Sequence, residues 1–292
     1  MDKTKSERAR GAAKPLRVPA HRSQWGAIPI VQLLLLLLLA GCSTRATATP
    51  PAPIFLTAAG STSAGLLLAD LAAAYSQQQP HINIEVQGGG SALGRQWVES
   101  GRVDVGLVSG PAEEPGSKLR RIPLARDAVA IITHPQNPIA GLSLVELRRI
   151  FGGRLLNWQD VAGPNLEIQV VSREDGSGTR AAFEAAVMAG QTVTPNAIVL
   201  PNSQSVIDFV AQQPNAVGYV SLPFTDGAGV HLVPIEGVLP SLTSLNDTSY
   251  PISQELALLV ATPESAAVRQ FIAFVQSPAA RQIISRQWGQ VR

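Results

Sequence analysis

The strongest constraint on the fold is a unit that recurs along the chain: an apolar run of strand character, a turn of small polar residues and a helical pattern. Complete units occupy residues 54–78, 82–101 and 166–187, and another strand-like run lies at 103–110. Strands that alternate with helices predict an α/β fold with largely parallel sheets. Ligands of such sheets bind beyond the carboxyl ends of the strands, so the turns of these units are where a site is expected.

The rest of the chain continues the alternation. A strand is expected at Val129–Thr133, and Ser143 is placed to cap an amphipathic helix over Leu144–Ile150. A helix, a Pro-Asn turn and a short strand follow in residues 203–222, and residues 265–288 have the pattern of two amphipathic helices. A chain of 292 residues is long enough for one large or two medium-sized domains.

The first 41 residues have the features of an export signal. A basic segment precedes an apolar run from Val31 to Ala40, a length typical of a signal peptide and short for a membrane-spanning helix. The run ends in Leu-Ala-Gly-Cys at residues 39–42, which resembles the bacterial lipobox, where cleavage precedes a cysteine that carries diacylglycerol. We therefore expect a signal peptide at 1–41, a lipid on Cys42 and a flexible tether at 42–53; an ordinary secretory signal is the alternative.

Charge and cysteine content exclude several classes of function. The chain has 23 Lys/Arg and 21 Asp/Glu, but residues 1–41 contain seven of the basic and two of the acidic residues. Without that segment acidic residues exceed basic ones by three, so no positive field remains to attract nucleic acid. Cys42 is the single cysteine, and the exported domain must therefore rely on its core instead of an internal disulfide.

Signatures of catalysis are scarce. His81, His134 and His231 have no histidine or carboxylate partner at metal-ligand spacing. The segment Ser172–Arg180 (SREDGSGTR) lacks both the lysine of a nucleotide-binding loop and the spacing of a serine nucleophile turn. We expect no cofactor, no metal and no enzymatic activity; a secreted phosphatase or other hydrolase that uses the Ser/Arg cluster is the alternative.

Hydroxyl and glycine residues gather at the expected helix starts. A helix N-terminus offers unpaired N–H groups and the positive end of a dipole, and Ser or Thr adds a neutral O–H donor. Each stretch alone is explained by N-capping, whereas several that meet in one cleft would form an oxyanion site. The candidates at these junctions are Thr62, Ser63, Ser91, Ser177, Gly178 and Thr179.

Two charged residues complete the expected site. Arg173 supplies a guanidinium fork that matches a tetrahedral oxyanion. Asp104 stands at the end of an apolar strand, where burial of a carboxylate costs free energy, so we expect it to have a functional role. The alternative is a structural acid bonded to backbone N–H groups or to an arginine. Because a carboxylate repels an oxyanion with no proton and accepts a hydrogen bond from one that keeps a proton, Asp104 is expected to favour hydrogen phosphate over sulfate.

Taken in order, these motifs resemble the phosphate-binding subunits of bacterial ABC phosphate transporters, which have the type II periplasmic-binding-protein fold. The similarity runs over most of residues 54–292, and its most specific element is SREDGSGTR. The resemblance implies that Thr62 contacts phosphate through its hydroxyl and Ser63 through its backbone N–H. It also places Ser91, Asp104, Arg173, Ser177, Gly178 and Thr179 around the ligand.

The resemblance further implies two α/β lobes joined by two crossovers, near residues 127–130 and 218–224. Lobe I is expected to comprise 54–128 and 223–292, and lobe II 129–222. The protein would be a monomer, held by the lipid on Cys42 at the outer face of the bacterial cytoplasmic membrane, that passes inorganic phosphate to an ABC permease. Another oxyanion, such as sulfate, molybdate or a phosphonate, and a role in sensing instead of uptake are the alternatives.

Overall fold

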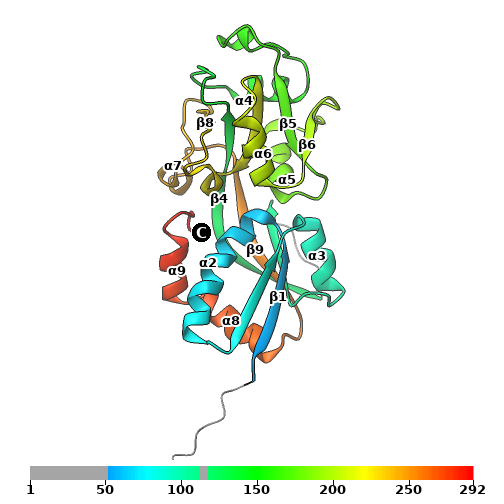
Figure 1. Cartoon of the computed structure of the whole chain (residues 1–292), viewed down its shortest axis with the longest axis vertical. Coiled ribbons are helices and arrows are strands. Elements are labelled where there is room, and N and C mark those ends of the chain that lie inside the picture. The colour runs from blue at the N-terminus through cyan, green and yellow to red at the C-terminus, as the bar shows by residue number, and fades with distance from the viewer. Residues whose placement is uncertain (1–51, 112–117, 292) are drawn as a thin grey trace, which may run out of the picture. The chain divides into compact units, whose positions relative to one another are not determined.

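The computed structural model describes residues 52–111 and 118–291. Its strands alternate with helices as the sequence predicts (Figure 1). The strands are β1 (Ile54–Gly60), β2 (Ile82–Gln87), β3 (Val105–Gly110), β4 (Leu119–Thr133), β5 (Gln169–Arg173), β6 (Ile198–Leu200), β7 (Ala216–Ser221), β8 (His231–Leu232) and β9 (Ser253–Ala261).

Most helices begin at a serine or asparagine whose side chain caps the first turn, as Ser143 does in a complete capping box with Glu146. The helices are α2 (Thr62–Gln78), α3 (Ser91–Glu99), α4 (Leu144–Phe151), α5 (Gly178–Phe183), α6 (Ser203–Val210), α7 (Leu242–Asn246), α8 (Ala266–Val275) and α9 (Pro278–Ile284). Three short segments complete the set: 3₁₀ turns η1 (Trp158–Val161) and η3 (Leu222–Thr225), and a π-helical turn η2 (Glu184–Met188) that continues α5.

The strands form two lobes; β4 runs from one lobe into the other, and β9 begins where the chain returns to lobe I. The strand order is β2-β1-β3-β9-β4-β7-β5-β6, with β8 also paired to β4. β1 pairs in parallel with β2 and β3, and β5 pairs in parallel with β6 and β7, which confirms the α/β class. β4 is antiparallel to its neighbours: its first part, to Ala128, pairs with β9 in lobe I, and from Val129 it pairs with β7 in lobe II.

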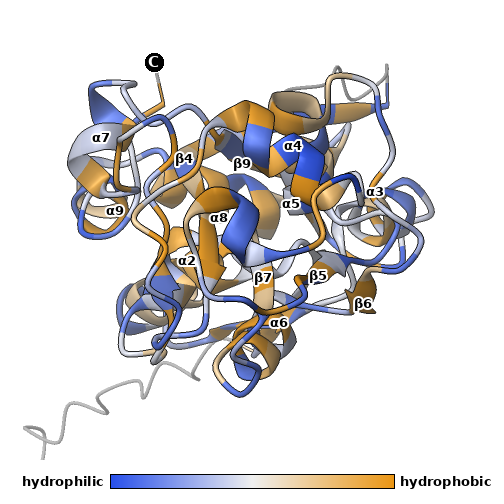
Figure 2. Ribbon diagram, turned by 90° about the horizontal axis from the view of Figure 1, so that it is seen from above, coloured by the Kyte–Doolittle hydropathy of each residue, from blue (hydrophilic) through white to orange (hydrophobic). Residues whose placement is uncertain are grey.

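Each lobe has its own hydrophobic core. In lobe I, leucines of α2 such as Leu67 and Leu71 pack with Phe271 of α8 against the sheet. The core of lobe II surrounds Trp158 and Tyr219, both fully buried. α8 is amphipathic, with hydrophobic and hydrophilic residues along one helix (Figure 2). These cores hold the ends of β1, β3 and β5 in place.

The second crossover lies later in the chain than the sequence suggested. The expected division assigned residues 223–292 to lobe I, with the crossing at 218–224. In the structure, Val233, Ile235 and Tyr250 pack in the core of lobe II, and His231 pairs with Thr133. The chain returns to lobe I only at Ser253, where β9 begins beside Ala128. The loop-rich segment 229–251 has no clear periodicity, so its hydrophobic residues gave no signal of the lobe they belong to.

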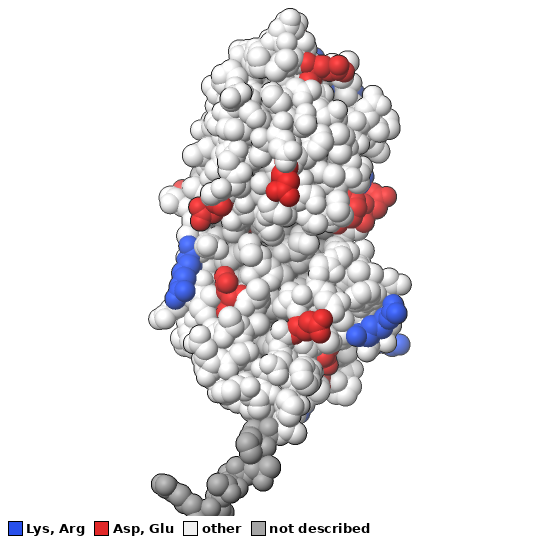
Figure 3. Space-filling view, viewed as in Figure 1, with Lys and Arg blue, Asp and Glu red and all other residues white. Residues whose placement is uncertain are grey.

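The expectations for the export signal, for the lipid on Cys42 and for most of the tether fall outside the described residues. Within residues 52–111 and 118–291 no helix combines the length and apolar character needed to cross a membrane. On the face shown in Figure 3, Lys and Arg side chains are scattered among Asp and Glu and do not gather into a basic patch.

Candidate functional site

The N-terminus of α2 lies at the carboxyl end of β1. Gly60, in the left-handed region with φ +137°, ends the strand so close to Leu107 and Gly94 that a Cβ has no room. Ser61 caps the helix by accepting a hydrogen bond from the N–H of Ala64 at 3.3 Å. The cap is therefore Ser61, which leaves Thr62 and Ser63 in the first helical turn, where N–H groups have no partner within the helix.

The N-terminus of α3 faces the same region. Gly90, with φ +85°, stands at the cap position and has no side chain to occupy the first-turn N–H groups. A Cβ on Gly88 would lie 3.5 Å from the Thr62 methyl group, so the glycine loop adjoins the start of α2. The N–H of Ala92 donates across to lobe II, to the carbonyl of Gly176 at 3.1 Å.

Lobe II contributes the N-terminus of α5. Ser177 caps it by accepting from the N–H of Arg180 at 3.3 Å, and its own O–H remains a donor. Gly178 lies against lobe I, where an added Cβ would overlap the Ser109 carbonyl and the Ser91 hydroxyl. The hydroxyls of Thr179 and Ser63 are 3.3 Å apart across the junction of the lobes. The structure thus brings the predicted hydroxyl and glycine residues of both lobes together.

Three serines of lobe I form a hydrogen-bonded cluster, here called the serine cluster: Ser61, Ser91 and Ser109. The Ser61 hydroxyl donates to the Ser109 hydroxyl at 2.9 Å, and the Ser109 N–H donates to the Ser91 hydroxyl at 3.0 Å. Sequence reasoning identified Ser91 but missed Ser61 and Ser109. The signal for Ser109 was its place at the carboxyl end of the apolar strand β3, the position where sites of parallel sheets gather.

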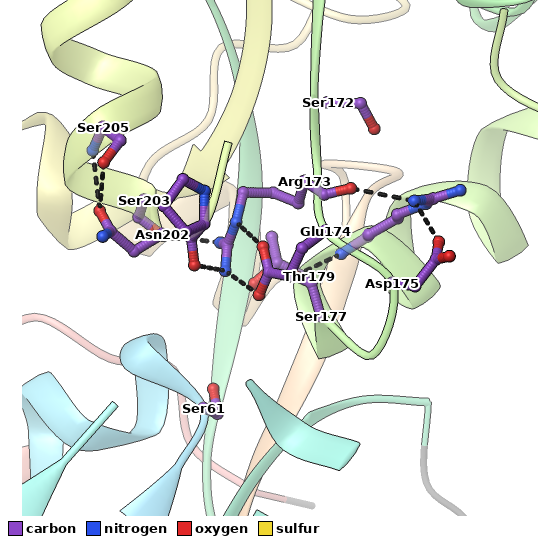
Figure 4. Close-up of polar contacts among 12 residues, drawn as sticks. Ser61, Ser172, Arg173, Glu174, Asp175, Ser177, Thr179, Asn202, Ser203 and Ser205 are labelled. Atoms are coloured by element: carbon purple, nitrogen blue, oxygen red, sulfur yellow. Dashed lines mark hydrogen bonds and ion pairs between the residues drawn. The ribbon is translucent and has the colours of Figure 1, made fainter. Parts of the chain in front are cut away.

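Arg173 ends β5 and is 1% exposed, and its backbone N–H donates to the Tyr219 hydroxyl at 3.3 Å. Burial raises the pKa of Tyr219 to about 12, so this phenol stays a neutral anchor for the strand end. The guanidinium donates to Glu174 from Nε at 2.8 Å and from Nη2 at 3.0 Å (Figure 4). Figure 4 also places this Arg173–Glu174 pair on the side of lobe II that faces Ser61.

Asp104 is not part of this site, which corrects the sequence expectation. It precedes β3, whereas the site lies beyond the other end of that strand, roughly 20 Å away at strand rise. Its carboxylate accepts from the N–H of Thr57 at 2.8 Å and from the Thr57 hydroxyl at 2.9 Å, so it joins β1 to β3. The structural alternative for this acid is the right one: hydrogen bonds of the adjoining strand compensate a carboxylate in an apolar strand.

A cavity of about 360 Å³ adjoins the site between α3 of lobe I and α5 of lobe II. Ser91, Ser109, Ser177 and Gly178 contribute to its wall. Its charged side chains are engaged in pairs: Arg180 contacts Asp175 and Glu184, and Arg121 contacts Glu255. The other charged residue in the wall, Arg95, also has a partner.

The sequence matches the PBP superfamily domain over residues 43–279. The chain belongs to this family. Within the PBP superfamily it is 32% identical over 201 residues to the phosphate-binding protein PstS of Bacillus subtilis, an alignment that covers 68% of this chain and 67% of the relative. It is therefore also a member of the phosphate-binding PstS group.

Solved structures of this PBP family have the same fold. A putative phosphate ABC transporter substrate-binding protein of Clostridium perfringens, solved with bound phosphate, superposes with a TM-score of 0.77 at 30% identity, over 82% of this chain and 100% of that one. An ABC-type phosphate transport receptor of Vibrio cholerae gives 0.67 at 29% identity, over 80% and 100%. These likenesses confirm the two-lobed α/β fold that the sequence predicts.

The polar groups of the site in this PBP-family protein are suited to binding a ligand. Its donors are hydroxyls and helix N–H groups, and its one buried guanidinium is paired with a carboxylate. Among residues 52–111 and 118–291, no group of three or more His, Cys, Asp or Glu could hold a metal ion. The relatives are named as binding and transport proteins, which agrees with the expectation of a binding role.

Proposed function

We propose that this protein captures inorganic phosphate between its two lobes and delivers it to an ABC permease. The observation that carries the proposal is the meeting, at one junction, of three helix N-termini and their hydroxyls from both lobes. Such donors suit a tetrahedral oxyanion because each N–H or O–H can point to a separate oxygen. The names of the relatives supply the identity of the anion.

Contacts from both lobes link binding to closure. A ligand bonded to Ser63 of lobe I and Thr179 of lobe II stabilises the arrangement in which those hydroxyls lie 3.3 Å apart. Because β4 and β9 are the strands that join the lobes, hinge motion would occur where they cross. The closed arrangement is what a permease would recognise.

The proposed setting is outside the cytoplasm. The apolar run that ends at Cys42 supports export and a lipid anchor with two acyl chains, enough for stable attachment. We infer a monomer, and the binding-protein names of the relatives support a role without catalytic activity.

Isothermal titration calorimetry with phosphate, arsenate and sulfate tests the proposal. We expect one phosphate per chain and a clear preference for phosphate over sulfate. Absence of phosphate binding, or equal binding of sulfate, would contradict it. Turnover of p-nitrophenyl phosphate by the purified protein, removed by substitution of Ser177, would support a hydrolase instead.

A further inference from the structure

Glu174 is the carboxylate that the structure places at the site. The Glu174 side chain, 27% exposed, lies between the Arg173 side chain, which is 2% exposed, and the glycine loop of lobe I. A Cβ on Gly90 would lie 3.3 Å from Glu174 Oε1, so the carboxylate reaches the residue that precedes Ser91. Figure 4 shows Glu174 beside Arg173 on the side toward Ser61.

Arg173 fixes this carboxylate. A guanidinium has five N–H donors, and Nε and Nη2 of Arg173 donate to the two carboxylate oxygens of Glu174 at 2.8 and 3.0 Å. Nη2 also donates to the Pro201 carbonyl at 3.4 Å, and Nη1 to the Ser203 hydroxyl at 3.3 Å. The fork that the sequence assigned to the ligand therefore holds Glu174, and Arg173 keeps one Nη1 hydrogen for an oxyanion.

Glu174 differs in its hydrogen-bonding chemistry from the other polar groups of the site. The serine cluster and the helix N–H groups can all donate hydrogen bonds, whereas an ionised carboxylate only accepts them. An oxyanion that carries a proton can donate it in a hydrogen bond to Glu174. An oxyanion without a proton places a negatively charged oxygen directly against the negatively charged carboxylate of Glu174. Phosphate and arsenate keep a proton at neutral pH, and sulfate does not.

We propose that Glu174 is the residue that makes the site prefer an oxyanion that carries a proton. The inference rests on the proposed function, because it assumes that the oxyanion binds at the junction of the lobes. Among the acids near the site, Glu174 differs from Asp175, whose carboxylate is 96% exposed and paired with Arg180. It takes the role that the sequence gave to Asp104, from the other lobe.

The test compares Glu174→Gln with the wild-type protein by calorimetric titration of phosphate, arsenate and sulfate. Arg173 can only donate, so it retains the amide oxygen of glutamine and leaves the NH₂ group to donate toward the ligand. We expect phosphate and arsenate affinity to fall about tenfold or more, the loss of one hydrogen bond to a charged group. Sulfate affinity should stay level or rise, which also shows that the variant is folded.

Asp175→Asn is the matched control, since it removes a neighbouring negative charge without touching Arg173. Its phosphate-to-sulfate preference should equal that of the wild type. The inference is overturned if Glu174→Gln keeps the wild-type preference for phosphate over sulfate, or if it binds neither anion. It is also overturned if the affinities for both anions rise equally, the result expected if Glu174 only competes with the anion for Arg173. A wild-type protein that binds no oxyanion would overturn the proposed function together with this inference; an unchanged preference in Glu174→Gln overturns the inference alone.

Discussion

Arg173 carries a full charge in a place with almost no access to solvent. A buried guanidinium costs several kcal/mol unless it is paired, and the ion pair with Glu174 supplies the partner. As a pair the two residues are neutral, so an anion at the site is held chiefly by dipoles: the hydroxyls of Ser177 and Thr179 and the N–H groups of three helix starts. The affinity of the site for an anion then depends on how closely the two lobes approach each other.

Gly178 sets that approach. We expect Gly178→Ala to lower phosphate affinity about 100-fold or more, because its Cβ would overlap the carbonyl of Ser109 and keep the lobes apart. Alanine is a good helix former, so the thermal unfolding midpoint should change little. Calorimetry and circular dichroism measure the two quantities.

Gly65→Ala is the control for this substitution. It lies on α2, and its Cβ would make an ordinary contact of 3.5 Å with Val86. Wild-type affinity in Gly178→Ala would show that closure does not require contact at this glycine.

Asp104 is expected to matter for stability and not for the ligand. Asp104→Ala removes the acceptor of two hydrogen bonds from Thr57, and we expect the free energy of unfolding to fall by about 1–3 kcal/mol. Urea denaturation measures the loss, with the exposed Asp70→Ala as control. If Asp104→Ala changed the preference for phosphate over sulfate, Asp104 would have a role in ligand binding, which would contradict the structure.

For single residues, the sequence shows which residue types stand at the turns, but it does not show which side chains they contact. Thr62, Ser63, Ser91 and the Ser177–Thr179 segment are found because glycine and hydroxyl residues at a strand–helix junction are visible in one dimension. Asp104 was assigned to the site because a carboxylate beside an apolar strand suggests a functional role. Only the register of β1 against β3, and the course of the Arg173 side chain, shows which carboxylate meets the other lobe.

Among the elements, β4 and β9 carry the connection between the lobes, and Asp127 is buried where they cross. It is 1% exposed, and its carboxylate accepts from Gln254 Nε2 at 2.7 Å. Burial raises the pKa of Asp127 from 3.8 to about 7, and hydrogen bonds offset only part of that rise. The joining strands thus contain an acid that is more easily protonated than in the unfolded chain.

This acid predicts a pH dependence. Between about pH 4 and pH 7 the folded state binds more protons at Asp127 than the unfolded state, so its contribution to stability is present at low pH and falls as pH rises. The free energy of unfolding of the wild type, relative to Asp127→Asn, should therefore decrease over that window, by up to about 1.4 kcal/mol per pH unit, and level off above it.

Urea denaturation of both proteins across the window measures the difference. Asp208→Asn, which changes an exposed acid on α6, should follow the wild-type profile. Parallel profiles for wild type and Asp127→Asn would show that Asp127 has an ordinary pKa.

Elements with strong periodicity could be predicted, and short ones could not. α2 follows from its apolar spacing after Gly60, and α4 follows from its amphipathic spacing and its cap, Ser143. α7 has five residues and β8 two, too short for a pattern to appear in the sequence. Their hydrophobic residues join the core of lobe II through contacts with β4, which is why the return to lobe I was placed about 30 residues too early.

For the molecule as a whole, the charge distribution offers little attraction for an anion. Past residue 41 acidic residues exceed basic ones by three, and the guanidinium at the site is paired. Binding should therefore depend on short-range hydrogen bonds, which salt screens weakly. We expect phosphate affinity to change less than about threefold between 0.05 and 0.5 M potassium chloride, measured by calorimetry. A steep loss with salt would indicate that exposed basic residues bind the anion.

The central claim is that phosphate lies between the lobes, held from both sides. An NMR titration of the ¹⁵N-labelled protein with phosphate tests it most directly, because each backbone N–H reports its own surroundings. The largest shift changes are expected at the N–H groups of Ser63 and Ser91 in lobe I and of Gly178 and Thr179 in lobe II. Changes confined to the neighbouring cavity, at Arg95 and Arg121 with Ser63 and Thr179 unaffected, would contradict the claim.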